Sequence, residues 1–242
     1  MSKKIVVFDF DETLGSFSQL FLFWNYIIKI LKIKNIKDQK IILFELLDIF
    51  PNFFRPLIIN ILNFVLQNKI NNNCKEVLIY TNNNGPIEWC NYIVEYLNYK
   101  TNKKIKVIDK IIKAFIVNGK QREKLRTTTD KSITDLIKYT KYSKDLEICF
   151  VDDQEHKNMI NDNVYYINVL PYNYSIDFNK MADTYYNKVL NNNIITKNNF
   201  ITKILKLNEY YTNKIYNKNE LNIHTIISKQ LLKYLDDFFN NL

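Results

Sequence analysis

The chain has 242 residues, of which 47% are hydrophobic and 14% aromatic, and its formal net charge is +9. This length and apolar content predict a globular protein with one principal domain plus additions, and they exclude a disordered tail. The 3 cysteines lie far apart without a CxxC pair, which argues against a disulfide framework or a zinc site and favours a reducing, intracellular compartment, cytoplasmic or nuclear.

The first predicted element is a buried strand at residues 4–10, with the sequence KIVVFDF. Two carboxylates, Asp9 and Asp11, stand where this strand should end. Two close anions repel each other and lose hydration unless a cation or a phosphoryl group lies between them. The spacing therefore predicts a ligand at this end of the strand.

A helical insert follows the first strand. The sequence predicts helices at 17–33 and 39–50, stopped by Pro51, and a third helix at 55–70 that leads back toward the sheet. The apolar run in 17–33 is too short to span a membrane, because polar residues interrupt it. We expect a buried helix there and no membrane association, with a membrane-surface helix as the alternative. Acidic residues also come too early for a signal peptide.

Three more runs predict buried strands, at 76–81, 146–152 and 164–169. A further run at 110–117 is a candidate fifth strand. Each run is continuously apolar and rich in β-branched and aromatic residues, and helix-length segments such as 87–97 separate the runs. This pattern is typical of a parallel sheet covered on both faces. After about Tyr172 the sequence predicts only helices, at 200–216 and 226–239.

The predicted fold is therefore α/β, with a Rossmann-like parallel sheet. We expect a catalytic core at residues 1–175, which carries the cap-like helical insert at 16–52. A helical C-terminal extension is expected at 176–242.

The positive charge is concentrated between Lys100 and Lys144, where 14 basic residues face 4 acidic ones. One interpretation is a solvated basic surface. The other is an electric field that attracts polyanions such as phosphopeptides or nucleic-acid ends.

Polar side chains follow several of the predicted strands. Because the carboxyl ends of parallel strands meet at one edge of a sheet, these side chains should converge with a lysine that precedes a helix. The converging set is Asp9, Asp11, Thr81, Lys131, Asp152 and Asp153. Neither His156 nor His224 suggests a metal pair, and we expect both to be surface or packing residues. An EF-hand calcium loop is excluded, because Leu14 stands where that loop requires glycine.

Four segments resemble, in order, the motifs of the haloacid dehalogenase superfamily of phosphohydrolases: VVFDFDETL, VLIYTNNNG, TDKSITDL and ICFVDDQEH. The resemblance covers about residues 3–172. Within the superfamily, the chain is most similar to phosphatases related to the RNA polymerase carboxy-terminal-domain phosphatases. It departs from that group where Asp152 is followed by Asp153 instead of asparagine, and in its long helical insert.

The resemblance implies a role for each residue of the set. Asp9 would be the nucleophile that forms an aspartyl phosphate, and Asp11 would be the general acid and base. Thr81, Asn82 and Lys131 would bind the phosphoryl group, with Lys124 and Lys138 as alternatives for the lysine. Magnesium would be the cofactor. Its ligands would come from Asp9, Asp11 through the main-chain carbonyl, Asp152 and Asp153.

The expected function is a magnesium-dependent phosphomonoester hydrolase, acting on a phosphoprotein or on another phosphomonoester. A protein serine/threonine phosphatase is one form of this activity. A nucleic-acid end phosphatase is an alternative that the basic segment favours, and a small-molecule phosphatase is another. A non-catalytic phosphate-binding scaffold is the alternative from a different class of protein.

Overall fold

The computed structural model describes residues 3–142, 145–190, 194–211 and 218–240. The chain forms two compact units. The first, here called the sheet unit, comprises 1–14, 55–172 and 222–242, and the second, the helical unit, comprises 15–54 and 173–221.

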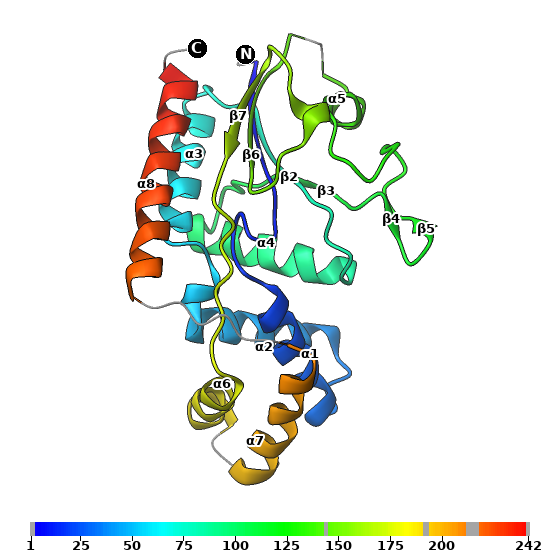
Figure 1. Cartoon of the computed structure of the whole chain (residues 1–242), viewed down its shortest axis with the longest axis vertical. Coiled ribbons are helices and arrows are strands. Elements are labelled where there is room, and N and C mark those ends of the chain that lie inside the picture. Colours follow the sequence, from blue (N-terminus) through cyan, green and yellow to red (C-terminus); the bar gives the residue numbers. More distant parts are fainter. Residues whose placement is uncertain (1–2, 143–144, 191–193, 212–217, 241–242) are drawn as a thin grey trace. The chain divides into compact units, whose positions relative to one another are not determined.

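The sheet unit contains a five-stranded sheet in which all neighbouring strands are parallel, in the order β3-β2-β1-β6-β7 (Figure 1). The strands are β1 (Lys4–Phe8), β2 (Glu76–Tyr80), β3 (Lys110–Ile112), β6 (Glu147–Asp152) and β7 (Val164–Asn168). The predicted α/β class with a Rossmann-like parallel sheet is therefore confirmed.

The candidate strand at 110–117 is divided in the structure. Its first three residues form β3 at the edge of the sheet, whereas β4 (Ile116–Val117) pairs with β5 (Lys120–Gln121) in a separate antiparallel hairpin. Asn118 and Gly119 make the turn with φ angles of 52° and 73°, a conformation that suits a tight two-residue hairpin loop. The predicted single strand is thus interrupted before this turn.

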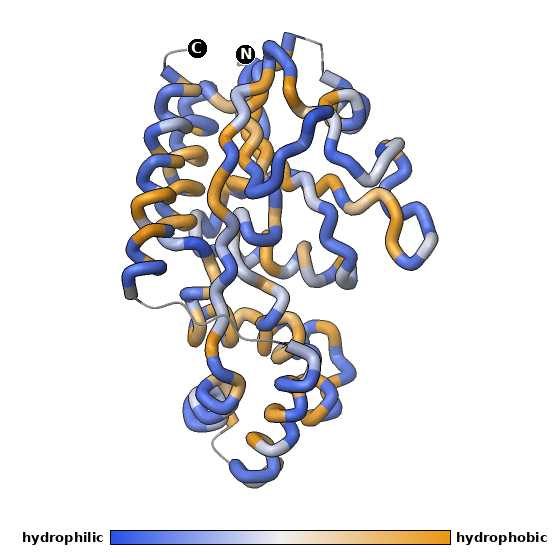
Figure 2. Tube along the Cα trace, viewed as in Figure 1, coloured by the Kyte–Doolittle hydropathy of each residue, from blue (hydrophilic) through white to orange (hydrophobic). Residues whose placement is uncertain are grey.

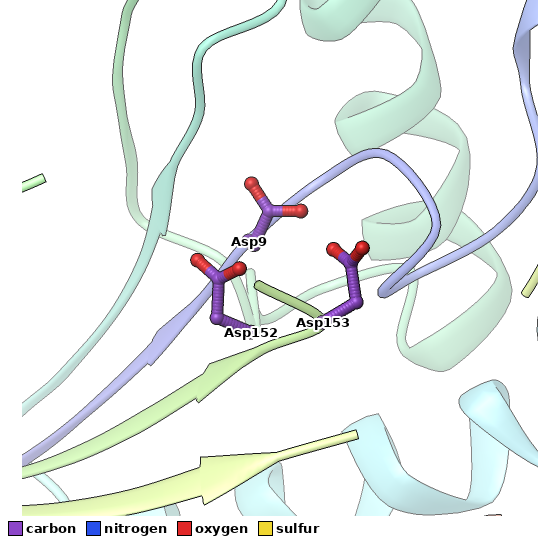
Figure 3. Close-up of side chains that lie close together, drawn as sticks. All are labelled: Asp9, Asp152 and Asp153. Carbon is purple, nitrogen blue, oxygen red and sulfur yellow. The ribbon is translucent and has the colours of Figure 1, made fainter. Parts of the chain in front are cut away.

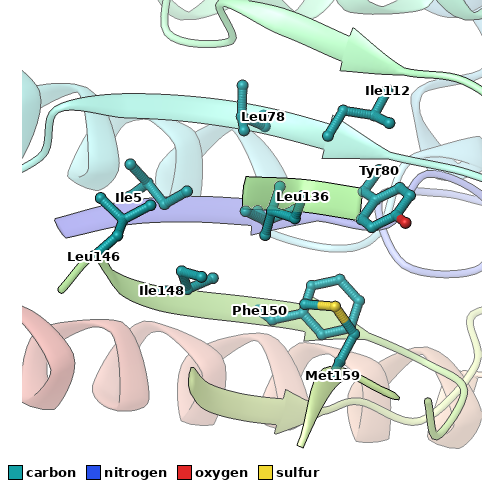
Figure 4. Packing of buried hydrophobic residues seen from close by; sticks show 10 residues of the cluster. Ile5, Leu78, Tyr80, Ile112, Leu136, Leu146, Ile148, Phe150 and Met159 are labelled. Atoms are coloured by element: carbon teal, nitrogen blue, oxygen red, sulfur yellow. The ribbon is translucent and has the colours of Figure 1, made fainter. Parts of the chain in front are cut away.

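Helices cover both faces of the sheet. On one face, α5 (Ile133–Thr140) places Leu136 among Ile5, Leu78 and Ile148 (Figure 4). On the other face, α3 (Ile58–Ile70) and α8 (Lys218–Asn240) lie side by side (Figure 1). A further helix, α4 (Ile87–Thr101), connects β2 to β3 in the chain. Figure 2 shows hydrophobic segments in the strand region between these helices, as a sheet covered on both faces requires.

Aromatic contacts attach α8 to the sheet unit. The ring of Phe239 lies 6.0 Å from that of Phe64 on α3, and Phe238 stacks on Tyr165 of β7, also at 6.0 Å. Lys4 of β1 donates a hydrogen bond of 2.8 Å to the carbonyl oxygen of Phe238. The last helix of the chain is therefore part of the sheet unit.

The helical unit combines α1 (Ser18–Ile30) and α2 (Ile36–Ile49) with α6 (Phe178–Tyr185) and α7 (Lys197–Leu205). Phe23 of α1 is fully buried, and its ring lies 6.5 Å from Phe178 and 6.1 Å from Tyr185. We expected residues 176–242 to form one extension. The structure divides this stretch instead, because α6 packs on Phe23 and contacts α7 through Tyr185 and Phe200, whereas α8 packs on the sheet.

Short helical turns complete the described chain: η1 (Pro51–Phe53), η2 (Lys157–Met159), η3 (Tyr186–Leu190) and η4 (Lys206–Glu209). Residues 212–216 of the helix predicted at 200–216 lie outside the described residues. None of the helices described has both the length and the apolar content that crossing a membrane requires.

Candidate active site

Three carboxylates meet at the carboxyl ends of β1 and β6. These strands are neighbours in the sheet, with Phe8 paired to Val151, so Asp9 comes to lie beside Asp152 and Asp153. One side-chain oxygen from each of the three aspartates lies within 4.8 Å of those of the other two (Figure 3). Carboxylate oxygens held this closely are suitable ligands for a hard divalent cation.

Lys131 lies between two of these carboxylates. Its Nζ contacts Asp9 Oδ1 and lies 2.6 Å from Asp152 Oδ2, and the side chain is only 2% exposed. Ser132 caps the following helix by accepting a hydrogen bond from the backbone N–H of Asp135, which fixes where α5 begins. The two alternative lysines, Lys124 and Lys138, are exposed.

Asp11 belongs to a different set of contacts. Its Oδ2 accepts a hydrogen bond of 2.8 Å from the side-chain amide of Asn83, in the loop after β2. The hydroxyl of Thr81 accepts the backbone N–H of Asn83 at 2.9 Å, and Asn83 Oδ1 accepts the N–H of Gly85 at 2.9 Å. The carboxylate of Asp11 is thereby held toward the β2 loop, and it is not part of the three-aspartate group.

A cavity of about 190 Å³ joins these groups. Six of its lining residues belong to the predicted set: Asp9, Asp11, Thr81, Asn82, Lys131 and Asp152. Four others were not predicted: Glu12, Asn83, Gln154 and His156. The structure therefore brings the predicted residues together, with Asp153 adjoining through the three-aspartate group.

The turn after β1 is held from two sides. Thr13 donates a hydrogen bond of 3.2 Å to Asp153 Oδ1 and accepts one of 3.1 Å from the backbone N–H of Asp153. The buried Arg55 donates to the carbonyl oxygens of Thr13 at 2.5 Å and of Glu12 at 2.7 Å. Because Glu12 has a φ of 55°, the turn is strained, and these contacts stabilise it.

Burial raises the pKa of Asp9 to about 7, and the negative charge of Asp152 adds to this effect while Lys131 opposes it. Burial also raises the pKa values of Asp11 and Asp153. For Asp152, burial acts in the same direction, but the hydrogen bond with His156 and the charge of Lys131 outweigh it and lower the pKa. Asp152 is therefore the ionised member of the pair, whereas Asp9 takes up a proton below about pH 7 when no further cation is bound.

Glu12 adds a further acid to the same cavity. Burial raises the pKa of Glu12 to about 7, and the charges of Asp11, Asp153 and Asp9 act in the same direction. Lys131 keeps a raised pKa, because Asp9 and Asp152 outweigh the opposing effect of its burial. The ammonium group of Lys131 therefore lies as a positive charge within a cluster of carboxyl groups. Clusters of residues with shifted pKa values are typical of functional sites.

Arg126 was not predicted from the sequence, and the structure places it behind the site. It is 2% exposed and donates to five oxygens: the carbonyls of Thr81, Lys113, Thr129 and Asp130, and Asn82 Oδ1. Its guanidinium group lies 4.8 Å from the centre of the Tyr80 ring. Arg126 thus joins the β2 loop to the segment that carries Lys131.

His156 is a packing residue, as expected, but it also lies at the site, which was not expected. Its Nε2 lies 3.4 Å from Asp152 Oδ2, and its side chain is one of those that line the cavity. Its ring also packs against Phe150 at 6.2 Å. The sequence contained no signal for this position, because a histidine four residues after a strand end fits a surface loop equally well. His224 is buried, with its ring 4.9 Å from that of Tyr172, and is a packing residue as expected.

The site combines a buried carboxylate beside an ammonium group, a second carboxylate held separately, and oxygens suited to a divalent cation. Such a set can bind a phosphoryl group and transfer it to a carboxylate oxygen. Comparison of the chain with protein-family models, with curated proteins and with solved structures finds no match.

Proposed function

We propose that this protein is a magnesium-dependent phosphomonoester hydrolase of the haloacid dehalogenase superfamily that acts through a phosphorylated Asp9. The observation that carries the proposal is the convergence of Asp9, Asp11 and Lys131 on one cavity of about 190 Å³. A binding module would need the cation, but it would have no use for a second carboxylate held apart from it.

In the proposed reaction, a carboxylate oxygen of Asp9 attacks phosphorus while the bond from phosphorus to the leaving oxygen breaks. Asp11 donates its proton to that leaving oxygen. A water molecule then attacks the phosphorus of the aspartyl phosphate, Asp11 takes up the proton of this water, and the bond between Asp9 and phosphorus breaks. Lys131 and Thr81 contribute positive charge and a hydroxyl group at the phosphoryl oxygens, with Asn82 beside them.

The three-aspartate group fits magnesium, because Asp9, Asp152 and Asp153 offer hard oxygen donors within 4.8 Å of one another. When bound, the ion would neutralise phosphoryl charge and orient the phosphate for in-line attack. The main-chain carbonyl of Asp11 is the further predicted ligand. The Asp11 carboxylate, held by Asn83, remains available for proton transfer.

The substrate proposed is a phosphoprotein or another phosphomonoester. A nucleic-acid end phosphatase, a small-molecule phosphatase and a non-catalytic scaffold are the alternatives. We also place the protein in a reducing, intracellular compartment. The support for this is that all three cysteines are buried free thiols, at Cys74, Cys90 and Cys149.

The test of this function is magnesium-dependent hydrolysis of an aryl phosphate and of a phosphoserine peptide, with and without a chelator. Asp11→Asn is expected to lower kcat/KM, which reports the steps up to departure of the leaving group, by about a hundredfold or more for the peptide but by far less for the aryl phosphate. The reason is that an aryl oxide leaves without needing a proton, whereas a serine alkoxide needs one. Asp162→Asn, an exposed aspartate in the loop before β7, is the matched control.

Equal losses on both substrates would contradict the acid role of Asp11. No magnesium-dependent hydrolysis of any phosphomonoester would contradict the enzyme and favour the scaffold.

Magnesium is expected to raise the melting temperature more at about pH 8 than at about pH 5. The folded pKa of Asp9, about 7, lies above its ordinary value of 3.8, so the metal-free protein holds a proton there that the unfolded chain has released. This proton stabilises the fold below about pH 4, and the stabilisation is lost as the pH rises through 7. At low pH magnesium must displace the proton, whereas at high pH it meets an ionised carboxylate.

Thermal unfolding with and without magnesium at the two pH values measures this difference. Asp153→Asn, which removes one oxygen donor of the three-aspartate group, should reduce the magnesium-induced gain at both. An equal gain at both pH values in the unmodified protein would contradict the assignment of Asp9 as a ligand.

A further inference from the structure

The sheet unit has a second and larger cavity, of about 440 Å³. It lies along β3, which forms one edge of the sheet, and shares no lining residue with the cavity at Asp9. Asn91 and Glu95 of α4 line one side of it, and Tyr139 of α5 also contributes. We call this cavity the β3 groove.

The charges in the β3 groove are unbalanced. Three lysines line it, Lys106, Lys110 and Lys113. Lys110 forms an ion pair of 2.5 Å with Glu76, and the groove's Asp109 is engaged by Lys69 at 2.5 Å. Within the described residues, the side chains of Lys106 and Lys113 have no carboxylate partner. The remaining carboxylate of the lining, Glu95 of α4, is itself engaged. The ammonium groups of Lys106 and Lys113 are thus available to an anionic ligand.

The groove adjoins the candidate active site through Arg126. One guanidinium nitrogen of Arg126 donates to the carbonyl oxygen of Lys113 at 3.0 Å, and the same nitrogen donates to Asn82 Oδ1 at 2.8 Å. Lys113 lines the groove, and Asn82 lines the cavity at Asp9. The groove and the cavity at Asp9 are therefore joined by a single buried side chain.

We infer that the β3 groove binds an acidic segment of a phosphoprotein substrate, beside its phosphorylated residue. This inference rests on the proposed function and adds the class of substrate. The lining favours a peptide over a nucleic acid, because it combines aliphatic walls from Val94, Ile108 and Ile111 with the amide of Asn91. Tyr139 is the one aromatic residue of the described lining, so the groove lacks the set of rings that base stacking uses. The hydroxyl of Tyr139 donates a hydrogen bond to the carbonyl oxygen of Ile111.

Lysines that flank an edge strand, as Lys106 and Lys113 flank β3, can also serve only to prevent pairing with another chain. A double variant, Lys106→Gln with Lys113→Gln, separates the two roles. The matched control is Lys103→Gln with Lys104→Gln, which removes the same charge from the same basic segment at two exposed residues outside the groove lining.

The measurement is kcat/KM for three substrates: a phosphoserine peptide with an acidic flank, the same peptide with a neutral flank, and an aryl phosphate. In the groove variant, the acidic peptide is expected to lose about fivefold to tenfold, while the other two substrates are unchanged. The control variant should stay within about twofold on all three. Melting temperatures verify that both variants fold.

Equal losses on the acidic peptide in both variants would overturn the groove in favour of a general electric field. A phosphate-ended oligonucleotide that depends on Lys106 and Lys113 as strongly as the acidic peptide would overturn the peptide class. Direct binding of the unphosphorylated acidic peptide, followed by fluorescence anisotropy, distinguishes failure of the groove from failure of the enzyme. Binding lost only in the groove variant supports the groove even if no phosphate ester is hydrolysed, and equal binding by all three proteins overturns it.

Discussion

Replacing Asp9 by asparagine is expected to lower magnesium-dependent hydrolysis of an aryl phosphate by about a thousandfold or more. The amide has nearly the shape of the carboxylate, but its oxygen is a far weaker nucleophile and carries no charge for a cation. The fold should persist, because Lys131 keeps its contact of 2.6 Å with Asp152 and can still donate to the amide oxygen. Initial rates at saturating magnesium, with melting temperatures beside them, measure both effects.

The matched control for this variant is Asp145→Asn. Asp145 forms an ion pair of 3.5 Å with Lys3, and both side chains are largely exposed, so its removal should leave the rate and the melting temperature nearly unchanged. If Asp9→Asn kept more than about a tenth of the activity, Asp9 would not be the nucleophile. If the retained activity still required magnesium, Asp11 would instead be the candidate nucleophile.

The sheet could be predicted because its strands carry their own signal. Continuous apolar runs such as residues 77–80 of β2, which are all buried, are typical of a sheet covered on both faces. Parallel pairing then places every strand end on one edge, so that Asp9, Thr81 and Asp152 come together without any knowledge of side-chain contacts. The convergence of the site follows from topology more than from any single motif.

The contacts within the site could not be predicted in the same way. Three asparagines follow Thr81, and nothing in the sequence indicates that Asn83 holds Asp11 while Asn82 accepts from Arg126. Arg126 itself lies in a basic segment where most of the charged side chains are exposed. Hydrogen-bond partners depend on how loops approach one another in space, and local sequence does not record this.

The division of the C-terminal helices has a similar cause. An amphipathic pattern shows that a helix buries one face, but it does not identify the surface that covers this face. α6 contributes Phe178 to the surroundings of Phe23, whereas α8 contributes Phe238 to those of Tyr165. Both helices have the same kind of pattern, so their assignment to two units required the structure.

Lys131→Met is expected to affect stability and activity together. Methionine has a similar length but no charge, so the variant leaves Asp9 and Asp152 facing each other without their shared ammonium group. Removing one partner of a buried ion pair costs about 3–5 kcal/mol. Hydrolysis should fall by about a hundredfold or more, because charge on the phosphoryl group and on Asp9 is no longer neutralised.

The loss of stability in Lys131→Met should depend on pH. Without the ammonium group the two carboxylates share a proton, and the pKa of Asp9, already about 7 in the unmodified protein, should rise further. The proton stabilises the variant at about pH 5, and this stabilisation is lost as the pH rises through the raised pKa, so the deficit should be largest at about pH 8. Magnesium should then recover more stability in the variant than in the unmodified protein.

Lys138→Met, on the α5 helix that follows Lys131, is the matched control, since Lys138 is exposed and should show neither effect. Denaturant unfolding at the two pH values, with and without magnesium, measures the deficit, and initial rates measure the activity. A deficit that does not change with pH would mean that Asp9 and Asp152 do not compete for a proton once Lys131 is gone. In that case the ammonium group would act through packing, and the charge balance inferred for the site would be wrong.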